Sequence, residues 1–209
     1  MSNQQLTPEA NAAGAGVGRA SGFELTRPGD PGAAGIDSAL ERNRRFAAAG
    51  GHAGAVVFPT LRLFVITCLD PRVDPVHFLG LRLSDAIVLR NVGGRVTPEV
   101  INNVAFIGQI AENVLPDSPL FEVAVIHHNQ CGAGALADEG FRRSYAERIG
   151  AEESALREHA VLDPAATVAQ DVERLRSAPA ISSRLTFSGH VYDVLTGLVE
   201  TVAPARGRA

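Results

Sequence analysis

The sequence predicts an α/β fold, in which a mainly parallel β-sheet is flanked by α-helices. Short apolar segments rich in β-branched residues alternate with longer segments whose apolar residues recur every three or four positions. Segments of the first kind are typical of strands buried on both faces of a parallel sheet, and those of the second kind are typical of amphipathic helices. Their alternation indicates right-handed βαβ crossovers, with helices on both faces of the sheet.

The chain of 209 residues is long enough for a single domain with a sizeable core and an additional terminal segment. Residues 1–36 are rich in Gly, Ala, Pro and Asn and show little periodicity, so we expect a flexible N-terminal arm there. The domain then covers residues 37–209. Its first element is a predicted helix over Asp37–Ala49, which its first residue can cap and which two glycines end.

Three short apolar segments are the expected parallel strands. They are Leu61–Leu69, Ala86–Val92 and Phe121–His128. A helix is predicted after the second strand, because Thr97 is a suitable N-cap and Pro98 occupies the first helical position. The apolar stripe of this helix consists of Val100, Val104, Ile107, Ala111 and Val114.

The remainder of the chain is predicted to be helical from Cys131 to Ser177 and to end in two strands. Asp163 followed by Pro164 marks the start of the last helix, by the same capping pattern. The apolar stripe of that helix is Val168, Val172 and Leu175. Residues 184–202 then predict a strand, a turn and a second strand.

The composition argues against several kinds of partner. Nineteen Lys and Arg against 23 Asp and Glu give a net charge of −4, whereas nucleic-acid-binding proteins usually show a basic excess. No apolar run approaches the roughly 20 residues of a membrane span, and the first residues lack the basic and apolar regions of a signal peptide. We therefore expect no nucleic acid, no membrane and a cytoplasmic location, where a disulfide between the two cysteines is not expected.

The segment Cys-Leu-Asp-Pro-Arg closes the first predicted strand. Residues i, i+2 and i+4 of an extended chain point the same way, so Cys68, Asp70 and Arg72 can face one cavity. This cavity is expected at the carboxyl end of the strand, where open α/β sheets place their sites. A plain ion pair at a strand end is the alternative interpretation of Asp70 and Arg72.

A second group of side chains with metal-binding chemistry follows the third strand. His128 and Cys131 are three residues apart, a spacing that lets both side chains of a turn bind one metal ion. With Cys68 they make a set of two thiolates and one imidazole, which suits zinc better than magnesium or calcium. Three protein ligands with one open position are typical of catalytic zinc, and Asp70 is the candidate for a fourth ligand. The alternative is that both cysteines are inert core thiols.

Three sequence blocks carry a resemblance to a known family. The blocks are CLDPR at residues 68–72, RNVGG at 90–94 and HHNQCG at 127–132. The content of these blocks, their order and their approximate spacing match the pattern of the β-carbonic anhydrases. The chain resembles that family from about Asp37 to Val202. The resemblance implies one Zn²⁺ per chain and reversible hydration of carbon dioxide to bicarbonate by attack of a zinc-bound hydroxide. The implied metal ligands are Cys68, His128 and Cys131.

The resemblance also implies roles for residues around the metal. Asp70 and Arg72 are the implied catalytic residues: Asp70 paired with Arg72 leaves the fourth position open and orients the hydroxide, whereas an unpaired Asp70 binds the metal and closes the site. The family is known in both forms. Gly93 and Gly94 are expected to form a loop near the substrate, with an ordinary turn as the alternative. The amide of Gly132 is expected to donate to a bound anion, with packing as the alternative.

Other activities stay open on the same motifs. Carbonyl sulfide and carbon disulfide hydrolases share the zinc motif, and a non-catalytic zinc- or bicarbonate-binding protein is a further alternative. A thiol redox protein is disfavoured because the chain lacks Cys-x-x-Cys. Pro71 stands where the family usually has a small residue, and Asn129-Gln130 replaces the usual Thr-Asp, so both departures change the surroundings of the metal.

The family's basic unit implies a homodimer or a higher homo-oligomer. The clefts of such a dimer are lined from both subunits. We expect the N-terminal arm and the helix over Asp37–Ala49 to contribute to the interface. The implied small-molecule partners are carbon dioxide and bicarbonate.

Overall fold

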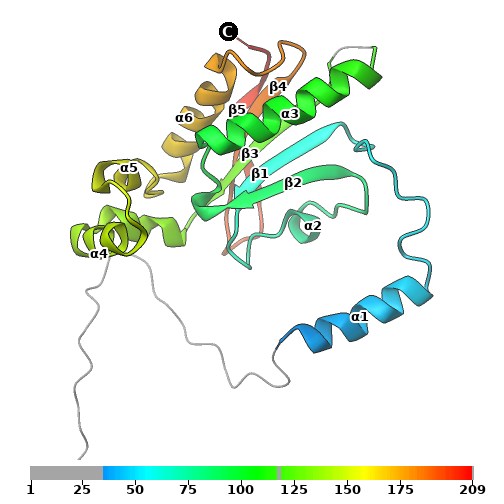
Figure 1. Ribbon diagram of the computed structural model, residues 1–209, viewed down its shortest axis with the longest axis horizontal. Coiled ribbons are helices and arrows are strands. Elements are labelled where there is room, and N and C mark those ends of the chain that lie inside the picture. The colour runs from blue at the N-terminus through cyan, green and yellow to red at the C-terminus, as the bar shows by residue number, and fades with distance from the viewer. Residues whose placement is uncertain (1–34, 117–118, 209) are drawn as a thin grey trace, which may run out of the picture.

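The protein is described by a computed structural model that covers residues 35–116 and 119–208 (Figure 1). The arm predicted over residues 1–36 lies outside the described residues, except for its last two. The sheet has five strands in the order β2-β1-β3-β4-β5. The strands are β1 (Leu63–Cys68), β2 (Ala86–Asn91), β3 (Glu122–His128), β4 (Thr186–Tyr192) and β5 (Val199–Arg206). β1 to β4 run parallel and β5 runs antiparallel to β4, which confirms the predicted mainly parallel sheet.

Helices follow most of the strands in the chain. The α-helices are α1 (Ile36–Ala48), α2 (Pro75–Phe78), α3 (Pro98–Val114), α4 (Glu139–Ile149), α5 (Glu153–Glu158) and α6 (Pro164–Ser177). Two short 3₁₀ helices are η1 (Val92–Gly94) and η2 (Gly132–Ala137). The region from Cys131 to Ser177 is therefore helical as predicted, but it is divided into η2, α4, α5 and α6.

The main apolar core lies between the sheet and the pair α3 and α6, which cover one face (Figure 1). Val100 and Val104 of α3 and Val168 of α6 are buried there against Phe64 of β1. The opposite face carries the short α2, where Phe78 stacks on Tyr192 with ring centroids 4.4 Å apart. Helices cover both faces as expected, but unequally.

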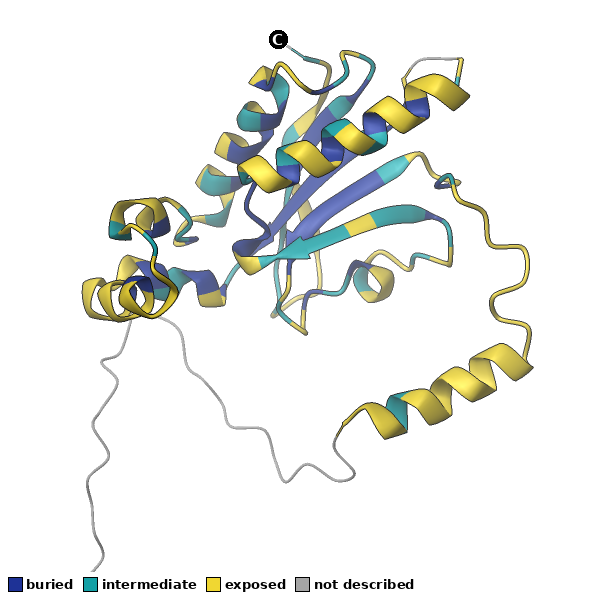
Figure 2. Ribbon diagram, viewed as in Figure 1, coloured by how far each residue is buried: buried dark blue, intermediate teal, exposed yellow. Residues whose placement is uncertain are grey.

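Burial differs among the strands that were predicted to be buried on both faces. β1 and β3 are central and almost wholly buried (Figure 2). β2 lies at the edge of the sheet, and its Val88 is 37% exposed. The expectation is therefore wrong for β2, because an edge strand has a neighbour on one side only.

Side chains cap two of the long helices where the sequence predicts it. The Thr97 hydroxyl accepts a hydrogen bond from the amide of Val100, and the Asp163 carboxylate accepts one from Ala166. The prediction that Asp37 caps the first helix is wrong. α1 begins one residue earlier, and Asp37 lies in its first turn, where an acidic side chain interacts favourably with the positive end of the helix dipole.

α1 lies apart from the sheet and buries none of its residues (Figures 1 and 2). Its exposed apolar side chains include Ile36, Leu40 and Phe46. Across residues 35–116 and 119–208, the structure contains no helix that is both long and apolar enough to cross a membrane.

Candidate metal centre

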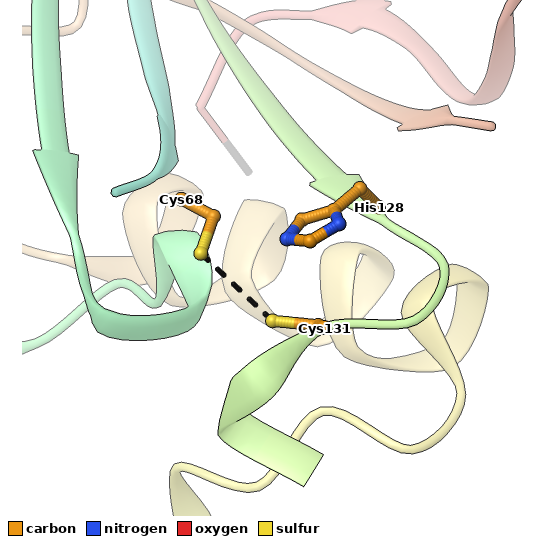
Figure 3. Close-up of side chains that lie close together, drawn as sticks. All are labelled: Cys68, His128 and Cys131. Carbon is orange, nitrogen blue, oxygen red and sulfur yellow. Dashed lines mark hydrogen bonds between the residues drawn. The ribbon is translucent and has the colours of Figure 1, made fainter. Parts of the chain in front are cut away.

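Cys68, His128 and Cys131 meet at the carboxyl edge of the sheet (Figure 3). One donor atom from each lies within 4.8 Å of the other two, and all three side chains are buried. The two sulfur atoms are 3.9 Å apart. Two sulfurs that each lie about 2.3 Å from a tetrahedral zinc ion are separated by roughly 3.8 Å, so the observed spacing fits a shared zinc ion.

The strand topology explains how residues from distant parts of the chain form this group. Cys68 is the last residue of β1 and His128 the last of β3, and these neighbouring parallel strands end at the same edge. Cys131 follows after a two-residue turn in which Gln130 has a left-handed backbone (φ 53°). This turn reverses the chain and returns the second sulfur toward the first.

The orientation of His128 also suits a metal ion. Its Nδ1 lies 2.8 Å from the carbonyl oxygen of Asn129, which places the ring proton on Nδ1 as the donor. Its Nε2 is buried and has no hydrogen-bond partner among the residues that the structure describes. A buried nitrogen with a free lone pair, next to two thiols, is the donor set that a structural or catalytic zinc ion binds.

The two thiols shift one another's acidity. The hydrogen bond between the two sulfur atoms, in which either can be the donor, lowers the pKa of Cys68 despite its burial. The same hydrogen bond, together with burial, raises the pKa of Cys131. One sulfur is therefore ready to bind as a thiolate, and the second proton is released when a metal binds, because the metal requires deprotonated ligands.

Asp70 forms a two-point ion pair with Arg72. The Nε atom of Arg72 lies 3.0 Å from Oδ1 and its Nη2 atom 2.7 Å from Oδ2. The Arg72 hydrogen bonds lower the pKa of Asp70, which stays ionised. In this structure Asp70 is held by Arg72, and within residues 35–116 and 119–208 the group of potential metal ligands consists of Cys68, His128 and Cys131.

Arg72 also contacts the turn between His128 and Cys131. Its Nη2 atom donates to the backbone oxygen of Gln130 (3.1 Å) and its Nη1 atom to the Gln130 side chain (3.4 Å). The neighbouring Asn129 is fixed from the other side, since it donates to Asp193 (2.8 Å) and accepts from the amide of Val194 (3.0 Å). Asn129 and Gln130, two of the three residues that depart from the family pattern, therefore hold the turn in place, a role that sequence reasoning did not predict.

Arg90 braces the loop that carries Asp70. Its Nε atom donates to the carbonyl of Cys68 (3.0 Å) and its Nη2 atom to the carbonyl of Asp70 (2.7 Å). A longer ion pair joins it to Asp74 (3.5 Å), the residue that caps α2. The guanidinium thus fixes the backbone on both sides of Leu69.

The glycine loop packs directly against β1. A β-carbon on Gly94 would lie 2.9 Å from the carbonyl carbon of Thr67 and 3.0 Å from the amide nitrogen of Cys68. One on Gly93 would lie 3.1 Å from the side chain of Ala133. Both glycines are buried and have positive φ, while Gly132 is exposed at the start of η2. A role of these three glycines in binding substrate stays a prediction.

A buried charged cluster behind the metal centre was not predicted from the sequence. His127 points away from the metal group, as strand alternation predicts, and its ring contacts Asp171 of α6. Asp171 in turn binds Arg95. The available signal was the position of Asp171 on the stripe of α6, between Val168 and Leu175, where a charged residue is unusual.

Comparisons with known proteins agree with this geometry. A family model described as carbonic anhydrase matches residues 63–199. A curated relative, the β-carbonic anhydrase 1 of Mycobacterium tuberculosis, is 29% identical over 146 residues, which are 70% of this chain and 85% of that protein. The carbon disulfide hydrolase of an Acidianus species is 28% identical over 158 residues, covering 65% of this chain and 74% of that protein. The crystal structure of a carbonic anhydrase from Streptococcus mutans, 32% identical, superimposes with a TM-score of 0.66 over 80% of this chain and 96% of that one.

Proposed function

The chain belongs to the carbonic anhydrase family, in its β class, and we propose that it catalyses the reversible hydration of carbon dioxide to bicarbonate and a proton. The observation that carries the proposal is the buried set of two sulfurs and one free imidazole nitrogen beside an ionised carboxylate. A site that only stored zinc would need no Asp70–Arg72 pair at its side.

Zinc is the metal that these donors fit, with one ion per chain held by Cys68, His128 and Cys131. When bound, zinc supplies a water molecule acidified to a pKa of about 7, which is nucleophilic enough to attack carbon dioxide near neutral pH. The alternative role of Asp70, as a fourth ligand that closes the site, belongs to the same proposal.

The chain's own groups then have distinct tasks in the reaction. The Asp70 carboxylate accepts a hydrogen bond from the attacking water and so fixes the direction of its lone pair. Arg72 keeps Asp70 ionised and oriented, because it binds both carboxylate oxygens. Gly93, Gly94 and the amide of Gly132 are the groups proposed to bind the substrate and bicarbonate. The proton leaves to solvent buffer.

Carbon disulfide hydrolysis is the second candidate, together with hydrolysis of carbonyl sulfide. The observation that favours it is the similarity to the carbon disulfide hydrolase of Acidianus, which is nearly as identical to this chain as the mycobacterial carbonic anhydrase. Carbon dioxide, carbonyl sulfide and carbon disulfide are all linear molecules with an electrophilic central carbon, so the same nucleophile can attack each of them. A third candidate is a zinc- or bicarbonate-binding protein without turnover.

A homodimer or higher homo-oligomer is the proposed assembly. α1 presents Ile36, Leu40 and Phe46 to solvent and packs on none of the sheet, so its apolar side is available to a second copy. Leu69, next to the metal ligand Cys68, and Val92, next to Gly93, are also exposed. A second copy that covers them would line the cleft beside the metal centre. A cytoplasmic location, expected from the sequence, stays a prediction.

The deciding experiment compares substrates on protein whose zinc content has been measured. Stopped-flow hydration of carbon dioxide should be proportional to bound zinc between pH 6.5 and 9, and a steep rise with pH would indicate that Asp70 closes the site at low pH. Release of sulfide from carbon disulfide or carbonyl sulfide, without hydration of carbon dioxide, would favour the second candidate. Zinc binding with none of these reactions would favour the binding protein.

A further inference from the structure

Asp171 of α6 is a buried carboxylate that the proposed function does not use. It is 0% exposed, and donors converge on it from four residues. One of them is the partly exposed Arg174 on the same helix, whose Nη1 atom lies 3.3 Å from Oδ1. Arg95 donates to both oxygens, with its Nε atom 2.7 Å from Oδ2 and its Nη2 atom 3.1 Å from Oδ1. The backbone amide of Val96 donates to Oδ2 (3.1 Å), and the Nε2 atom of His127 lies 3.3 Å from the same oxygen.

Stability alone is a poor explanation for this arrangement. Removing two charges from water costs several kcal/mol per ion, and apolar side chains of similar volume often replace a buried ion pair with no loss of stability. The pair is nevertheless fully satisfied, because Arg95 also donates to the carbonyls of Glu158 (2.8 Å) and Ala160 (3.1 Å). Such a complete set of hydrogen bonds fixes positions more than it adds stability.

Two branches lead from Asp171 to the strands that carry the metal ligands. The first passes through His127, which directly precedes His128 in β3 and whose Nδ1 atom lies 2.9 Å from the hydroxyl of Thr167. The second passes through Arg95 and Val96 to Gly94, which packs against the backbone of Cys68. The branches are joined, because the Nε2 atom of His127 lies 3.2 Å from the carbonyl oxygen of Gly94.

We propose that Asp171 is a positioning residue for the metal centre. It fixes His127 and the segment from Gly94 to Val96 relative to α6, and thereby holds His128 and Cys68 at the spacing that one zinc ion requires. This inference rests on the proposed zinc site. Ligands held in place before the metal arrives bind it more tightly, because less ordering is left for the binding step.

The test measures zinc affinity rather than activity. Zinc binding by the Asp171→Asn variant is followed by competition with a chromophoric chelator, and folding by circular dichroism under the same conditions. The substitution keeps the shape of the side chain and removes its charge. We expect zinc to bind roughly tenfold more weakly, as it does when groups behind metal ligands are altered. A variant that stays about 99% folded loses no affinity through unfolding. The tenfold loss of zinc affinity in such a variant therefore results from a change in the geometry of the zinc ligands.

Asp85→Asn is the matched control. Asp85 is also buried (8% exposed) and accepts hydrogen bonds from the hydroxyl of Thr60 (2.8 Å) and the amide of Arg82 (2.8 Å), but it lies at the opposite edge of the sheet, before β2. The control is expected to lose stability and to keep the zinc affinity of the parent chain.

Thr167→Val is the milder second variant, because it leaves the Asp171 ion pair in place and keeps the side-chain shape. It removes the partner of His127 Nδ1, together with the hydrogen bond from the Thr167 hydroxyl to the carbonyl oxygen of Asp163 (2.9 Å). We expect zinc to bind about threefold more weakly to it; if Asp171→Asn does not fold, this variant decides. Folded Asp171→Asn and Thr167→Val variants with the zinc affinity of Asp85→Asn would overturn the inference and leave the zinc site intact. A parent chain that binds no zinc would overturn both.

Discussion

Gly94 lies so close to Cys68 that a β-carbon on the glycine would be 3.0 Å from the Cys68 amide nitrogen. The glycine also has a φ of 67°, a conformation that L-residues other than glycine rarely adopt. The absence of a side chain at position 94 therefore allows the loop after β2 to pack against the strand that ends in a metal ligand.

Gly94→Ala should lower the free energy of unfolding by about 2–4 kcal/mol, because backbone strain and a backbone clash add. Gly80→Ala is the matched control, since Gly80 has a similar φ of 64° but a β-carbon added there would meet nothing within 4 Å. It should lose only about 1 kcal/mol. Urea unfolding of both variants measures the difference, and equal losses would contradict the close-packing argument.

Cys68→Ser and His128→Ala should each abolish stoichiometric zinc binding at micromolar zinc. Each substitution leaves two of three ligands, and the remaining pair cannot hold the ion alone. Metal analysis after gel filtration measures the loss. His52→Ala, which alters an exposed histidine outside the metal group, should retain one zinc per chain. Normal turnover by a zinc-free Cys68→Ser protein would refute the proposed mechanism.

Asp70→Asn should retain zinc and lose about 10²-fold in kcat/KM for carbon dioxide. The amide has one acceptor oxygen instead of two and lacks the charge that Arg72 stabilises, and positioned acid–base groups contribute effects of this size. Stopped-flow assays on variants with equal zinc content measure the loss. Asp37→Asn, at an exposed position in α1, is the control with unchanged rate. Equal rates for the two variants would remove Asp70 from the mechanism.

The Asp171 ion pair should make stability depend on pH in the acid range. Burial tends to raise the pKa of Asp171, but the hydrogen bonds from His127 and Arg95 outweigh it, and the pKa is lowered. A carboxylate with a lowered pKa in the folded state stabilises the protein above its unfolded pKa of about 3.9, and this contribution is lost as the pH falls through the folded value.

The stability difference between the parent chain and Asp171→Asn should therefore be constant from pH 7 to about 5 and shrink below about pH 4. At neutral pH it should be about 3–5 kcal/mol, because the variant leaves Arg95 buried without a charged partner. Urea unfolding at a series of pH values measures it. A stability difference that grows as the pH falls would show that the pKa of Asp171 is raised, and not lowered, in the folded protein.

α1 should contribute to the proposed dimer. Leu40→Glu places a charge in the apolar side of the helix and should shift the chain toward the monomer in analytical ultracentrifugation at micromolar concentration. Ser38→Glu adds the same charge on the opposite side of α1 and should leave the assembly unchanged. A parent chain that is monomeric at all concentrations would contradict the assembly itself.

Local sequence rules predicted most of the elements, because capping and hydrophobic periodicity act over a few residues. Thr97 and Asp163 start their helices as predicted, whereas Asp37 does not, since an acidic residue is favourable both as an N-cap and in the first turn. The exposure of β2 was missed because the order of strands in a sheet depends on contacts between distant segments.

The sequence by itself determined which residues have the chemistry for a metal site. Cys68 and His128 stand at the ends of predicted strands and Cys131 stands three residues beyond His128, while Asp70 and Arg72 stand two residues apart. These features depend on residue type and on distances along the chain, which can be read directly.

Only the tertiary structure decided which groups meet across the chain. Arg72 contacts Gln130, and Asp171 reaches Arg95 and His127, although 58, 76 and 44 residues respectively separate the members of these pairs. No local pattern connects them, because their proximity results from the parallel pairing of β1 with β3 and from the packing of α6 on the sheet. The donor set follows from residue identity, while its rigidity follows from packing.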